Sequence, residues 1–434
     1  MALRATTQHI YYFWGGKSGI DVINLYSDWG DFTELADANK SVAFVNAKLN
    51  TSSPQFRETL PRIIIESETK IVLDMANAAD VGDNIDMYIT IVEFDNDDVN
   101  IQHGIRGNGS GSDTTNYTIS AVDLSSSIPY LQMRDVYTDG RTIPAEAELT
   151  NTTTLTVRRP PGGPTHYFAW VAIDFGSANI DNLETGTIDL NVGTDSYTTN
   201  GLLSSNFDHD KTALFWYNFA DNGSTLPNNI HSTGGYIQFQ GTSPTDDLYA
   251  YLTTSHNSDT RLRYWAIEFA GDVSVQHGNQ TIGTGDGTSV DTTITSVDLD
   301  RSMVWPGNYF PFAKTNNTQE DTSDFISREL TTSTNLQFQR NSTGSYSYDV
   351  EWQVIEFDET VYEQEGYRFR ADDGSESGAS WLADQDTDTS RPIGTTTRLR
   401  TIVDTTGGGG TNAEGLQLEY RKVGDADSEW RKIE

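Results

Sequence analysis

The sequence predicts an all-β protein assembled from tandem antiparallel β-sandwich modules, and three observations carry this prediction. Runs rich in Val, Ile, Thr, Tyr and Phe, with a period of two, are broken by clusters of Gly, Asn, Asp and Ser, a pattern typical of strands and turns. Convincing helical stripes are scarce. A short apolar motif that ends in an acidic residue and Phe recurs four times, which indicates internal duplication.

The four copies of this motif divide most of the chain into units of similar length. They read "TIVEF" at 90–94, "VAIDF" at 171–175, "WAIEF" at 265–269 and "QVIEF" at 353–357. We expect each copy to be the last strand of a β module, which gives modules at 1–94, 95–175, 176–269 and 270–357. The second and fourth units match best, because "ISAVDLSSS" (119–127) corresponds to "ITSVDLDRS" (294–302). The predicted order of the modules is therefore A-B-A′-B′.

The pattern changes at the C-terminal end of the chain. In "LQLEYRKV" (416–423) the apolar residues Leu416, Leu418 and Tyr420 alternate with other residues, and the polar run "GDADSE" that follows indicates a turn. We therefore expect residues 358–434 to form a fifth β-sandwich, immunoglobulin- or fibronectin-like in type.

The charge of the chain is strongly negative and evenly spread. Asp and Glu number 63 against 28 Lys and Arg, so the formal net charge is −35. Such a surface repels itself in dilute buffer, but molar salt shortens the Debye length to about 3 Å. The composition favours a protein from a halophilic source, with an ordinary acidic protein as the alternative. Nucleic acid is an unsuitable partner, because no basic stripe is available to neutralise phosphates.

Cysteine usage and hydropathy exclude further classes. The chain has no Cys, so neither disulfides nor thiolate metal sites are expected. The first residues, "MALRATTQHIYYFWGG", lack the apolar region of a secretory signal, and no run of about 18 apolar residues is present. We therefore expect synthesis in the cytoplasm without a signal peptide and no insertion into a membrane.

The repeated acidic residues Glu93, Asp174, Glu268 and Glu356 are the first candidates for chemistry. A catalytic carboxylate needs a specific partner and a pocket, whereas four copies in a repeat favour an architectural role. We expect these carboxylates to accept backbone N–H groups at a strand end or to pair with Arg of a neighbouring strand. No catalytic residue and no enzymatic activity are predicted.

Two histidines recur at matching places. His103 and His277 each follow Gln and precede Gly, and neither has the further ligands within its own unit that a metal site requires. We interpret the Gln–His pair as a polar cap of a turn. The alternative is a site that several chains assemble together in an oligomer.

Other motifs match ligand-binding patterns only in part. Asp384, Asp386 and Asp388 have the spacing of a calcium loop, but Thr389 and Thr395 replace the Gly and Glu of that motif. They remain weak candidates for loosely bound calcium or sodium, and an acidic solvated loop is the alternative. "FWGGKSG" (13–19) ends like a phosphate-binding loop but lacks its first Gly and the following helix. "GNGSGS" (107–112) and "GTGDGTS" (283–289) indicate hairpin loops.

Aromatic residues and glycosylation sequons leave two questions open. Aromatic residues concentrate in "IYYFWGG" (10–16), "LFWYNFADNG" (214–223) and "VWPGNYFPF" (304–312), which favours a core or a subunit interface and leaves a glycan site as the alternative. Sequons for N-glycosylation are frequent in this Asn- and Thr-rich chain, and the sequence does not decide whether they are used. They lie at Asn39, Asn50, Asn108, Asn116, Asn151, Asn222, Asn279, Asn316 and Asn341.

Taken together, the motifs resemble modules of virion structural proteins in tailed viruses of bacteria and archaea. The resemblance rests on "WAIEF" and "WQVIEF", on "VSVQHG" and "SVDLDRS", and on the terminal pattern "EGYRFRADDGSESGASWLA…RLR…LQLEYRKVG…W". A fainter similarity, in strand pattern only, is to small oligomeric sugar-binding sandwiches of the H-type lectin kind.

The resemblance implies a place on the exterior of a virion and no catalysis. The expected function is a capsid turret, spike or decoration, with a tail fibre, a receptor-binding protein or a carbohydrate-binding adhesion module as the alternatives. The expected partners are further copies of the chain around a symmetry axis, other virion proteins, and a glycan or protein of the host surface. Residues 1–94 are the expected anchor to the particle.

Overall fold

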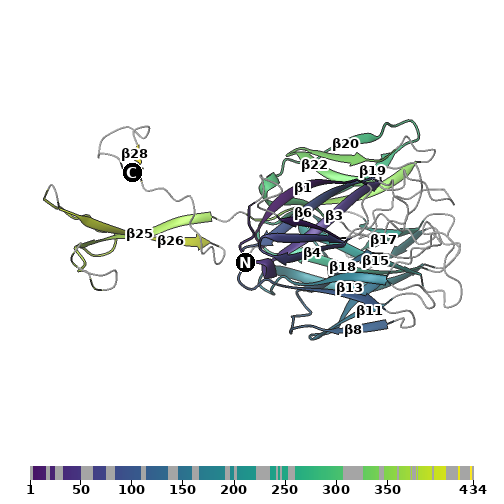
Figure 1. Ribbon diagram of the computed structural model, residues 1–434, viewed down its shortest axis with the longest axis horizontal. Helices are drawn as coiled ribbons and strands as arrows, with labels where there is room; N and C mark the ends of the chain where they lie inside the picture. Colours follow the sequence, from purple (N-terminus) through teal and green to yellow (C-terminus); the bar gives the residue numbers. More distant parts are fainter. Residues whose placement is uncertain are drawn as a thin grey trace. The chain divides into compact units, whose positions relative to one another are not determined.

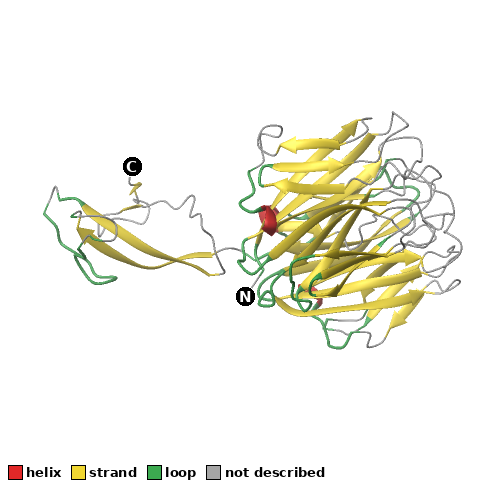
Figure 2. Ribbon diagram, turned by 60° about the horizontal axis from the view of Figure 1, so that its bottom comes forward, coloured by secondary structure: helices red, strands yellow, loops and turns green. Residues whose placement is uncertain are grey.

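The computed structural model describes most of the chain in two compact units, residues 1–359 and residues 360–434. The described residues are 3–15, 20–24, 33–49, 62–74, 84–108, 114–134, 145–158, 166–190, 196–199, 203–220, 235–240, 243–244, 247–252, 260–305, 326–341, 347–358, 361–371, 373, 378, 380–392, 395–406, 419–420 and 431–432. Most of them lie in strands, and the rest form loops, turns and a few 3-10 helices (Figure 2). The predicted all-β class is confirmed. No helix in these residues is long and apolar enough to cross a membrane.

The described part of residues 1–359 contains four successive segments, each with six strands (Figure 1). Segment 1 comprises β1 (Ala5–Gly15), β2 (Ile20–Asn24), β3 (Ser41–Leu49), β4 (Arg62–Ser67), β5 (Lys70–Asp74) and β6 (Asn84–Phe94). Segment 2 comprises β7 (Asn100–Asn108), β8 (Thr114–Thr118), β9 (Ser127–Arg134), β10 (Glu146–Asn151), β11 (Thr154–Arg158) and β12 (His166–Asp174).

Segments 3 and 4 follow the same plan. Segment 3 comprises β13 (Ile180–Leu190), β14 (Ser196–Thr199), β15 (Thr212–Ala220), β16 (Gly235–Phe239), β17 (Leu248–Leu252) and β18 (Thr260–Phe269). Segment 4 comprises β19 (Ser274–Ile282), β20 (Ser289–Thr293), β21 (Ser302–Trp305), β22 (Ser327–Thr332), β23 (Asn335–Gln339) and β24 (Tyr348–Glu356).

All four segments have one strand order. In each, the first, sixth and third strands form one antiparallel sheet, and the second, fifth and fourth strands form another. We call these the inner sheet and the outer sheet. The acidic residue and Phe of the repeated motif lie at the end of the sixth strand, which is the central strand of the inner sheet. The strand orders do not distinguish an A from a B type, so the A-B-A′-B′ order stays a prediction from sequence similarity.

Each inner sheet is buried on both faces. In β15, Ala213, Phe215 and Tyr217 belong to a cluster that links all four segments, whereas Leu214 and Trp216 belong to the core between the two sheets of segment 3. The strands of a sheet that is covered on both faces have continuous apolar sequences rather than alternating ones. This explains why "ALFWY" is uninterrupted, and it makes the inner sheets the centre of the unit.

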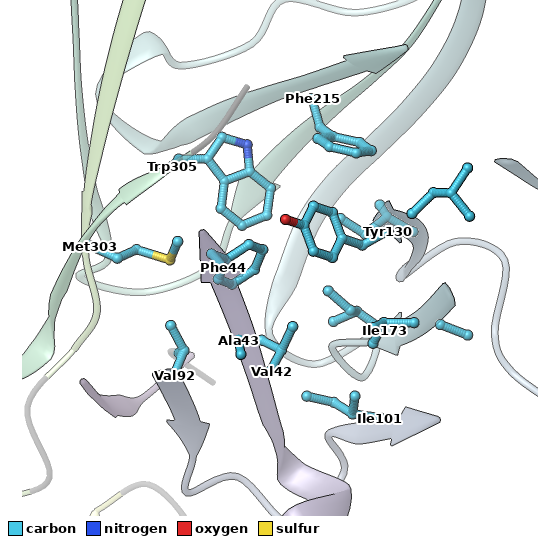
Figure 3. Packing of buried hydrophobic residues seen from close by; sticks show 14 of the residues in the cluster. Val42, Ala43, Phe44, Val92, Ile101, Tyr130, Ile173, Phe215, Met303 and Trp305 are labelled. Atoms are coloured by element: carbon cyan, nitrogen blue, oxygen red, sulfur yellow. The ribbon is translucent and has the colours of Figure 1, made fainter. Parts of the chain in front are cut away.

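The third strands of the four segments bring four aromatic rings together at this centre. Phe44, Tyr130, Phe215 and Trp305 lie at matching positions on β3, β9, β15 and β21, and Figure 3 shows their rings facing one another. The ring centroids are 5.0 Å apart for Phe44–Tyr130, 6.0 Å for Tyr130–Phe215, 6.2 Å for Phe215–Trp305 and 5.4 Å for Phe44–Trp305. These contacts form a closed cycle, so the four segments surround one central aromatic cluster.

The Phe residues of the repeated motif form a second layer. Phe94 packs edge-on against Phe175 at 5.9 Å and against Phe357 at 5.6 Å, and Phe175 packs edge-on against Phe269 at 5.8 Å. All four rings are at most 3% exposed. Edge-to-face pairs of this kind add about 0.5–1.5 kcal/mol each beyond the burial of their area. The invariant Phe of the motif is therefore a contact between segments.

Backbone hydrogen bonds at the N-terminal end join segment 4 to segment 1. The N–H of Asp358 donates to the carbonyl of Leu3 at 3.1 Å, and the N–H of Asp95 donates to the carbonyl of Arg4 at 3.1 Å. Arg4 and Asp358 also form a parallel bridge. The first described residues thus lie between the ends of segments 1 and 4 and connect them.

The second unit, residues 360–434, is described only in part. Strand β25 (Val361–Ala371) pairs with β26 (Thr397–Thr406), and β27 (Glu419–Tyr420) pairs with β28 (Arg431–Lys432). Leu416 and Leu418 lie outside the described residues. The immunoglobulin- or fibronectin-like sandwich expected here stays a prediction.

The Gly-rich loops differ from the expected hairpins. Residues 283–288 connect β19, in the inner sheet of segment 4, to β20, in its outer sheet. The expectation of a hairpin loop is wrong because these neighbours in sequence pair with other strands. Arg340 holds this crossover by donating to the carbonyls of Gly283 at 3.0 Å and Asp286 at 2.7 Å. Residues 109–113 of the matching loop lie outside the described residues.

Removing one ring of the central aromatic cluster should destabilise the whole unit. Phe215 is fully buried and contacts the rings of Tyr130 in segment 2 and Trp305 in segment 4, so Phe215→Ala should lower the free energy of unfolding by roughly 3–5 kcal/mol. Urea unfolding followed by tryptophan fluorescence measures this change. Phe13→Ala is the matched control, because Phe13 is 49% exposed and its loss should cost well under half as much. Equal effects of the two variants would contradict the central role of the cluster.

Candidate functional site: the joints between the segments

The four acidic residues of the repeated motif all make the same hydrogen bond. Each carboxylate accepts the backbone N–H of an Asp that precedes the third strand of its own segment. The bonds are Asp37 to Glu93 at 2.7 Å, Asp123 to Asp174 at 2.9 Å, Asp208 to Glu268 at 3.2 Å and Asp298 to Glu356 at 3.1 Å. Glu356 also forms an ion pair with Arg301 at 2.7 Å. The expected architectural role, backbone N–H acceptance at a strand end, is what the geometry shows.

The Asp that donates this bond starts a tight turn. In each segment its side chain accepts the N–H two residues later, as in Asn39 to Asp37 at 2.8 Å and Asp300 to Asp298 at 3.0 Å. An Asp side chain is well suited to this local bond. The turn is a short 3-10 helix in three segments: η1 (Ala38–Lys40), η3 (His209–Lys211) and η5 (Leu299–Arg301).

The sequence contains a signal for this turn, and only the second and fourth copies lie in matching motifs, "ISAVDLSSS" and "ITSVDLDRS". The pattern is Asp, three residues, then Ser or Thr at the start of the third strand. It occurs four times, at Asp37/Ser41, Asp123/Ser127, Asp208/Thr212 and Asp298/Ser302. The Ser or Thr is at most 2% exposed in every case. In two copies the hydroxyl donates back to the Asp carbonyl, from Ser41 at 2.8 Å and from Thr212 at 2.6 Å.

Burial affects the carboxylates that hold the turn. Desolvation raises the pKa of Glu93 and of Glu268, and the backbone N–H bonds from Asp37 and Asp208 act in the opposite direction. In each case the bond stabilises the ionised form that burial disfavours. These carboxylates are thus committed to the turn.

The Gln–His pair lies within strands and does not cap a turn. His103 lies in β7 and His277 in β19, so the expectation of a turn-capping dipeptide is wrong. The side chain of Gln102 accepts the N–H of Ser120 at 2.6 Å and donates to its carbonyl at 3.1 Å. Gln276 makes the same two bonds with Thr295, at 2.8 and 3.0 Å. The Gln therefore attaches its strand to a loop of its own segment.

The His of the pair reaches the neighbouring segment. Nε2 of His103 lies 3.0 Å from the carbonyl of Ser41 in segment 1, and Nε2 of His277 lies 2.8 Å from the carbonyl of Thr212 in segment 3. A third Gln–His pair, in which Ile10 replaces the Gly, makes the same contact: Nε2 of His9 lies 3.1 Å from the carbonyl of Leu299 in segment 4. Because a carbonyl only accepts, Nε2 carries the proton in each ring. Each His thus joins its own segment to the region of the Asp turn in a neighbouring segment.

Burial keeps these rings neutral. Desolvation lowers the pKa of His9 and of His103, and it lowers the pKa of His277 from 6.5 to about 4. The carbonyl partners oppose this shift but do not reverse it. A neutral imidazole bonded to a main-chain carbonyl is a structural group. No group of three or more His, Asp or Glu that could hold a metal ion occurs among the described residues.

The Gly after the Gln–His pair makes room for an aromatic ring. A Cβ on Gly104 would lie 2.1 Å from the ring of Trp170, and one on Gly278 would lie 2.3 Å from that of Trp352. These residues are direct partners in the strand register. At the matching position of segment 1, Ile10 lies opposite Ile89. In segments 2 and 4 the Gly on one strand therefore leaves space for the Trp ring on the adjacent strand.

The joint between segments 2 and 3 is different. A bulge in β13 between Ile180 and Asn182 precedes the position of the pair, which holds Glu184 and Thr185. Glu184 takes the place of Gln and accepts the N–H of Ser204 at 2.7 Å, whereas Thr185 is exposed. Ion pairs join these two segments instead.

The ion pairs of this joint centre on Arg263 of segment 3. Its guanidinium lies 3.3 Å from Glu146 and 3.2 Å from Glu148, both on β10 of segment 2. The side chain of Glu146 is only 1% exposed, and Arg158 pairs with the same two carboxylates. Each of the two carboxylates is thus shared by two guanidinium groups, whose attraction offsets part of the cost of burying Glu146.

Polar groups also cross the other joints. Gln132 of segment 2 accepts the N–H of Ile63 and donates to the carbonyl of Ala43 at 2.8 Å, both in segment 1. In the same way Gln353 of segment 4 both accepts from and donates to the backbone of Leu214 in segment 3, at 2.7 and 2.8 Å. These buried amides fix the register of one segment on the next.

The candidate ion site in the second unit is occupied by internal contacts. Asp386 accepts the N–H of Tyr367 at 2.8 Å, and Asp388 accepts the hydroxyl of Tyr367 at 2.8 Å. Asp384 is 97% exposed and lies 3.7 Å from Arg368. The three carboxylates thus serve three separate contacts, and no set of three acidic side chains converges among the described residues.

The remaining candidate motifs fall into two groups. Residues 16–19 of "FWGGKSG", and Asn50, Asn222 and Asn316 among the sequons, lie outside the described residues. Of the aromatic runs, Phe215, Trp216 and Trp305 are core residues, whereas Tyr11 is 50% exposed. The interpretation as core holds for the third strands, and the glycan alternative is not tested.

Comparison with known proteins adds no identification. No known protein-family model matches the sequence, and no curated protein matches it.

The neutral histidines predict a pH dependence of stability. Since the pKa of His277 is about 4 in the folded chain and 6.5 when unfolded, its contribution is complete above pH 6.5 and is lost as the pH falls towards 4. The stability difference between wild type and His277→Gln should therefore shrink by at most roughly 3 kcal/mol over this interval. Urea unfolding at pH 7, 5.5 and 4.5 measures it. Asn279→Gln, on an exposed position of β19, should show no such change, and a constant difference for His277→Gln would refute the assignment.

The Gly–Trp packing predicts a non-additive pair of substitutions. Gly278→Ala should cost about 1–3 kcal/mol, because its Cβ would overlap the Trp352 ring. The same change should cost less in a Trp352→Ile background, which reproduces the aliphatic pair of segment 1. Gly285→Ala is the control, since a Cβ there meets nothing within 4 Å. An equal cost of Gly278→Ala in both backgrounds would show that the overlap is not the cause.

Proposed function

We propose that this chain is a non-catalytic structural component of the exterior of a virus particle, a capsid turret, spike or decoration. One observation carries the proposal: the repeated acidic residues and glutamines, which are natural candidates for chemistry, hold turns and loops of their own segments, and the repeated histidines join neighbouring segments. A chain that commits its repeated polar residues to internal hydrogen bonds is suited to a structural role. The motif resemblance to modules of virion proteins supports the location.

The proposal includes architectural details that the strand orders do not establish. We propose that each segment is a β-sandwich, that the segments arose by duplication in A-B-A′-B′ order, and that the second unit is an immunoglobulin-like sandwich. Several chains assemble around a symmetry axis, and other virion proteins are their partners. The charge of −35 favours a halophilic source, where salt screens the repulsion.

Labelling of released particles tests the proposal. Antibodies against residues 1–359 should bind particles released from the cells that encode this chain, at regular positions in electron micrographs. Label on the head favours a turret or decoration, and label at the tip of a tail favours the fibre alternative. Label that stays with the cells, and is missing from purified particles, would overturn the proposal.

A truncated chain tests which part is attached. Segment 1 is an integral part of the closed cycle of aromatic contacts, so deleting residues 1–94 would disrupt the body itself. Deleting residues 360–434 leaves that cycle complete. If the body is the anchor, particles should incorporate the truncated chain as well as the full chain. Loss of incorporation would place the attachment in the second unit.

A further inference from the structure

Two large aromatic side chains are exposed on the first strand of the chain. Tyr11 and Phe13, on β1, are 50% and 49% exposed. Because they are two residues apart on one strand, they lie on the same face of the inner sheet of segment 1. His9, two residues before them on that face, contacts the carbonyl of Leu299 in segment 4. The two rings therefore continue the joint between segments 1 and 4 to the surface, and we call them the aromatic strip.

The fold does not require rings at these places. The strand register gives the matching positions of segments 3 and 4, and all of them hold polar residues that are exposed: Thr187, Asp189, Asn279 and Thr281. In segment 2, Ile105 matches Tyr11 and is 46% exposed. The same backbone thus accepts small polar side chains where segment 1 has two rings. Adjacent exposed apolar side chains that the fold does not need are typical of an interaction site.

The ring of Tyr11 is held in a fixed orientation. Its hydroxyl donates to Oδ1 of Asp86 at 2.8 Å, and its ring centroid lies 5.3 Å from that of Tyr88, which is also on β6. Oδ2 of Asp86 lies 3.0 Å from Nζ of Lys48. Burial and the hydrogen bond to Asp86 raise the pKa of Tyr11 to about 12, so the phenol stays neutral. A fixed, half-exposed ring is a preformed platform, because little freedom is lost when a ligand stacks on it.

Hydrogen-bonding groups of segment 4 lie near this platform. Gln339, on β23, accepts from Nζ of Lys48 at 3.1 Å, and its side chain also bonds to Tyr88. Glu329, on β22, acts electrostatically on the hydroxyls of Tyr11 and Tyr88. Glu329 and Gln339 are both partly exposed. An amide and a carboxylate, which together offer donors and acceptors to a ligand, thus adjoin the aromatic strip.

We propose that the aromatic strip is a binding site for a neutral polysaccharide, with pyranose rings stacked on Tyr11 and Phe13. A face of a pyranose ring carries mainly C–H groups, which suits the face of an aromatic ring, and its hydroxyl groups need polar partners such as Glu329 and Gln339. A neutral ligand fits the charge of the chain, because a net charge of −35 repels anions. This inference does not depend on the proposed virion location.

Binding of three neutral oligosaccharides to the full chain tests the site. The probes are cellohexaose, maltohexaose and mannohexaose, which present pyranose rings in different linkages. Isothermal titration calorimetry with each sugar at up to about 10 mM should detect binding of at least one of them to the wild-type chain. The sugar that binds most tightly is then used with the variants.

A double variant that copies segment 4 removes the aromatic strip. Tyr11→Asn/Phe13→Thr places on β1 the residue types that β19 carries at the matching positions, so the fold should stay intact. Its affinity for the sugar should fall by about tenfold or more, since two stacked rings contribute on this scale.

Ile105→Asn is the matched control, because it makes the same kind of change at the matching position of segment 2. Its affinity should stay within about twofold of wild type, because Ile105 lies outside the aromatic strip. Circular dichroism and urea unfolding of each variant confirm that the fold is intact.

Four outcomes would overturn the proposal. One is the absence of binding of all three sugars to the folded wild-type chain. Another is equal weakening by Ile105→Asn and by the double variant, which would show that the rings are not the site. The third is binding of choline at least as tight as that of the sugar, with the same sensitivity to the double variant, which would identify a cation site.

The fourth outcome concerns a second copy of the chain. A smaller oligomer of the double variant in analytical ultracentrifugation, with sugar binding unchanged, would identify the aromatic strip as an interface between copies. None of these results bears on particle labelling, so failure here and failure of the proposed function are distinguishable.

Discussion

The structure of residues 1–359 depends on the burial of both faces of four inner sheets against one another. One face of each inner sheet covers its own outer sheet, and the other meets the neighbouring segments at the central aromatic cluster. Each six-stranded segment is small, and small cores leave a narrow margin of stability. Sharing a second buried face therefore supplies stability that a lone segment would lack. This constraint accounts for the uninterrupted apolar runs and for the closed cycle of aromatic contacts.

A common centre also explains where polar groups occur. Polar groups buried at the joints must be hydrogen-bonded, and two kinds of contact meet this need. Three joints use a neutral His on a carbonyl, and the joint of segments 2 and 3 uses Arg263 with Glu146 and Glu148. In β13 the matching register position, opposite Trp265, holds Thr185 instead of His. The joints thus share a backbone arrangement, while the side chains that bridge them differ.

The second unit contrasts with this body. In its described residues Arg368 and Arg370 contact the ring of Trp381, which is 43% exposed. The repeated polar residues of the first unit instead bond to main-chain groups of that unit.

The sequence by itself determined the all-β class, the four repeats and the architectural role of the acidic residue before Phe. These follow from local patterns: a period of two, recurrence of a motif, and the absence of a unique carboxylate pair. The sequence also contains a third Gln–His pair, at His9, and two further Asp turns. Their neighbouring residues differ from those of the other copies, so the repeat is hard to recognise there.

Only the tertiary structure decided what the Gln–His–Gly motif does. The acceptor of each His lies in another segment, between 62 and 290 residues away in the chain, so no local pattern identifies it. The Gly is explained only by the Trp of the adjacent strand, because strand register brings the two together. In the same way, only the pairing of β25 with β26 places Arg368 opposite Arg400 and Arg370 opposite Arg398. Long-range pairing is set by how buried surfaces fit one another, and that information is spread over the whole chain.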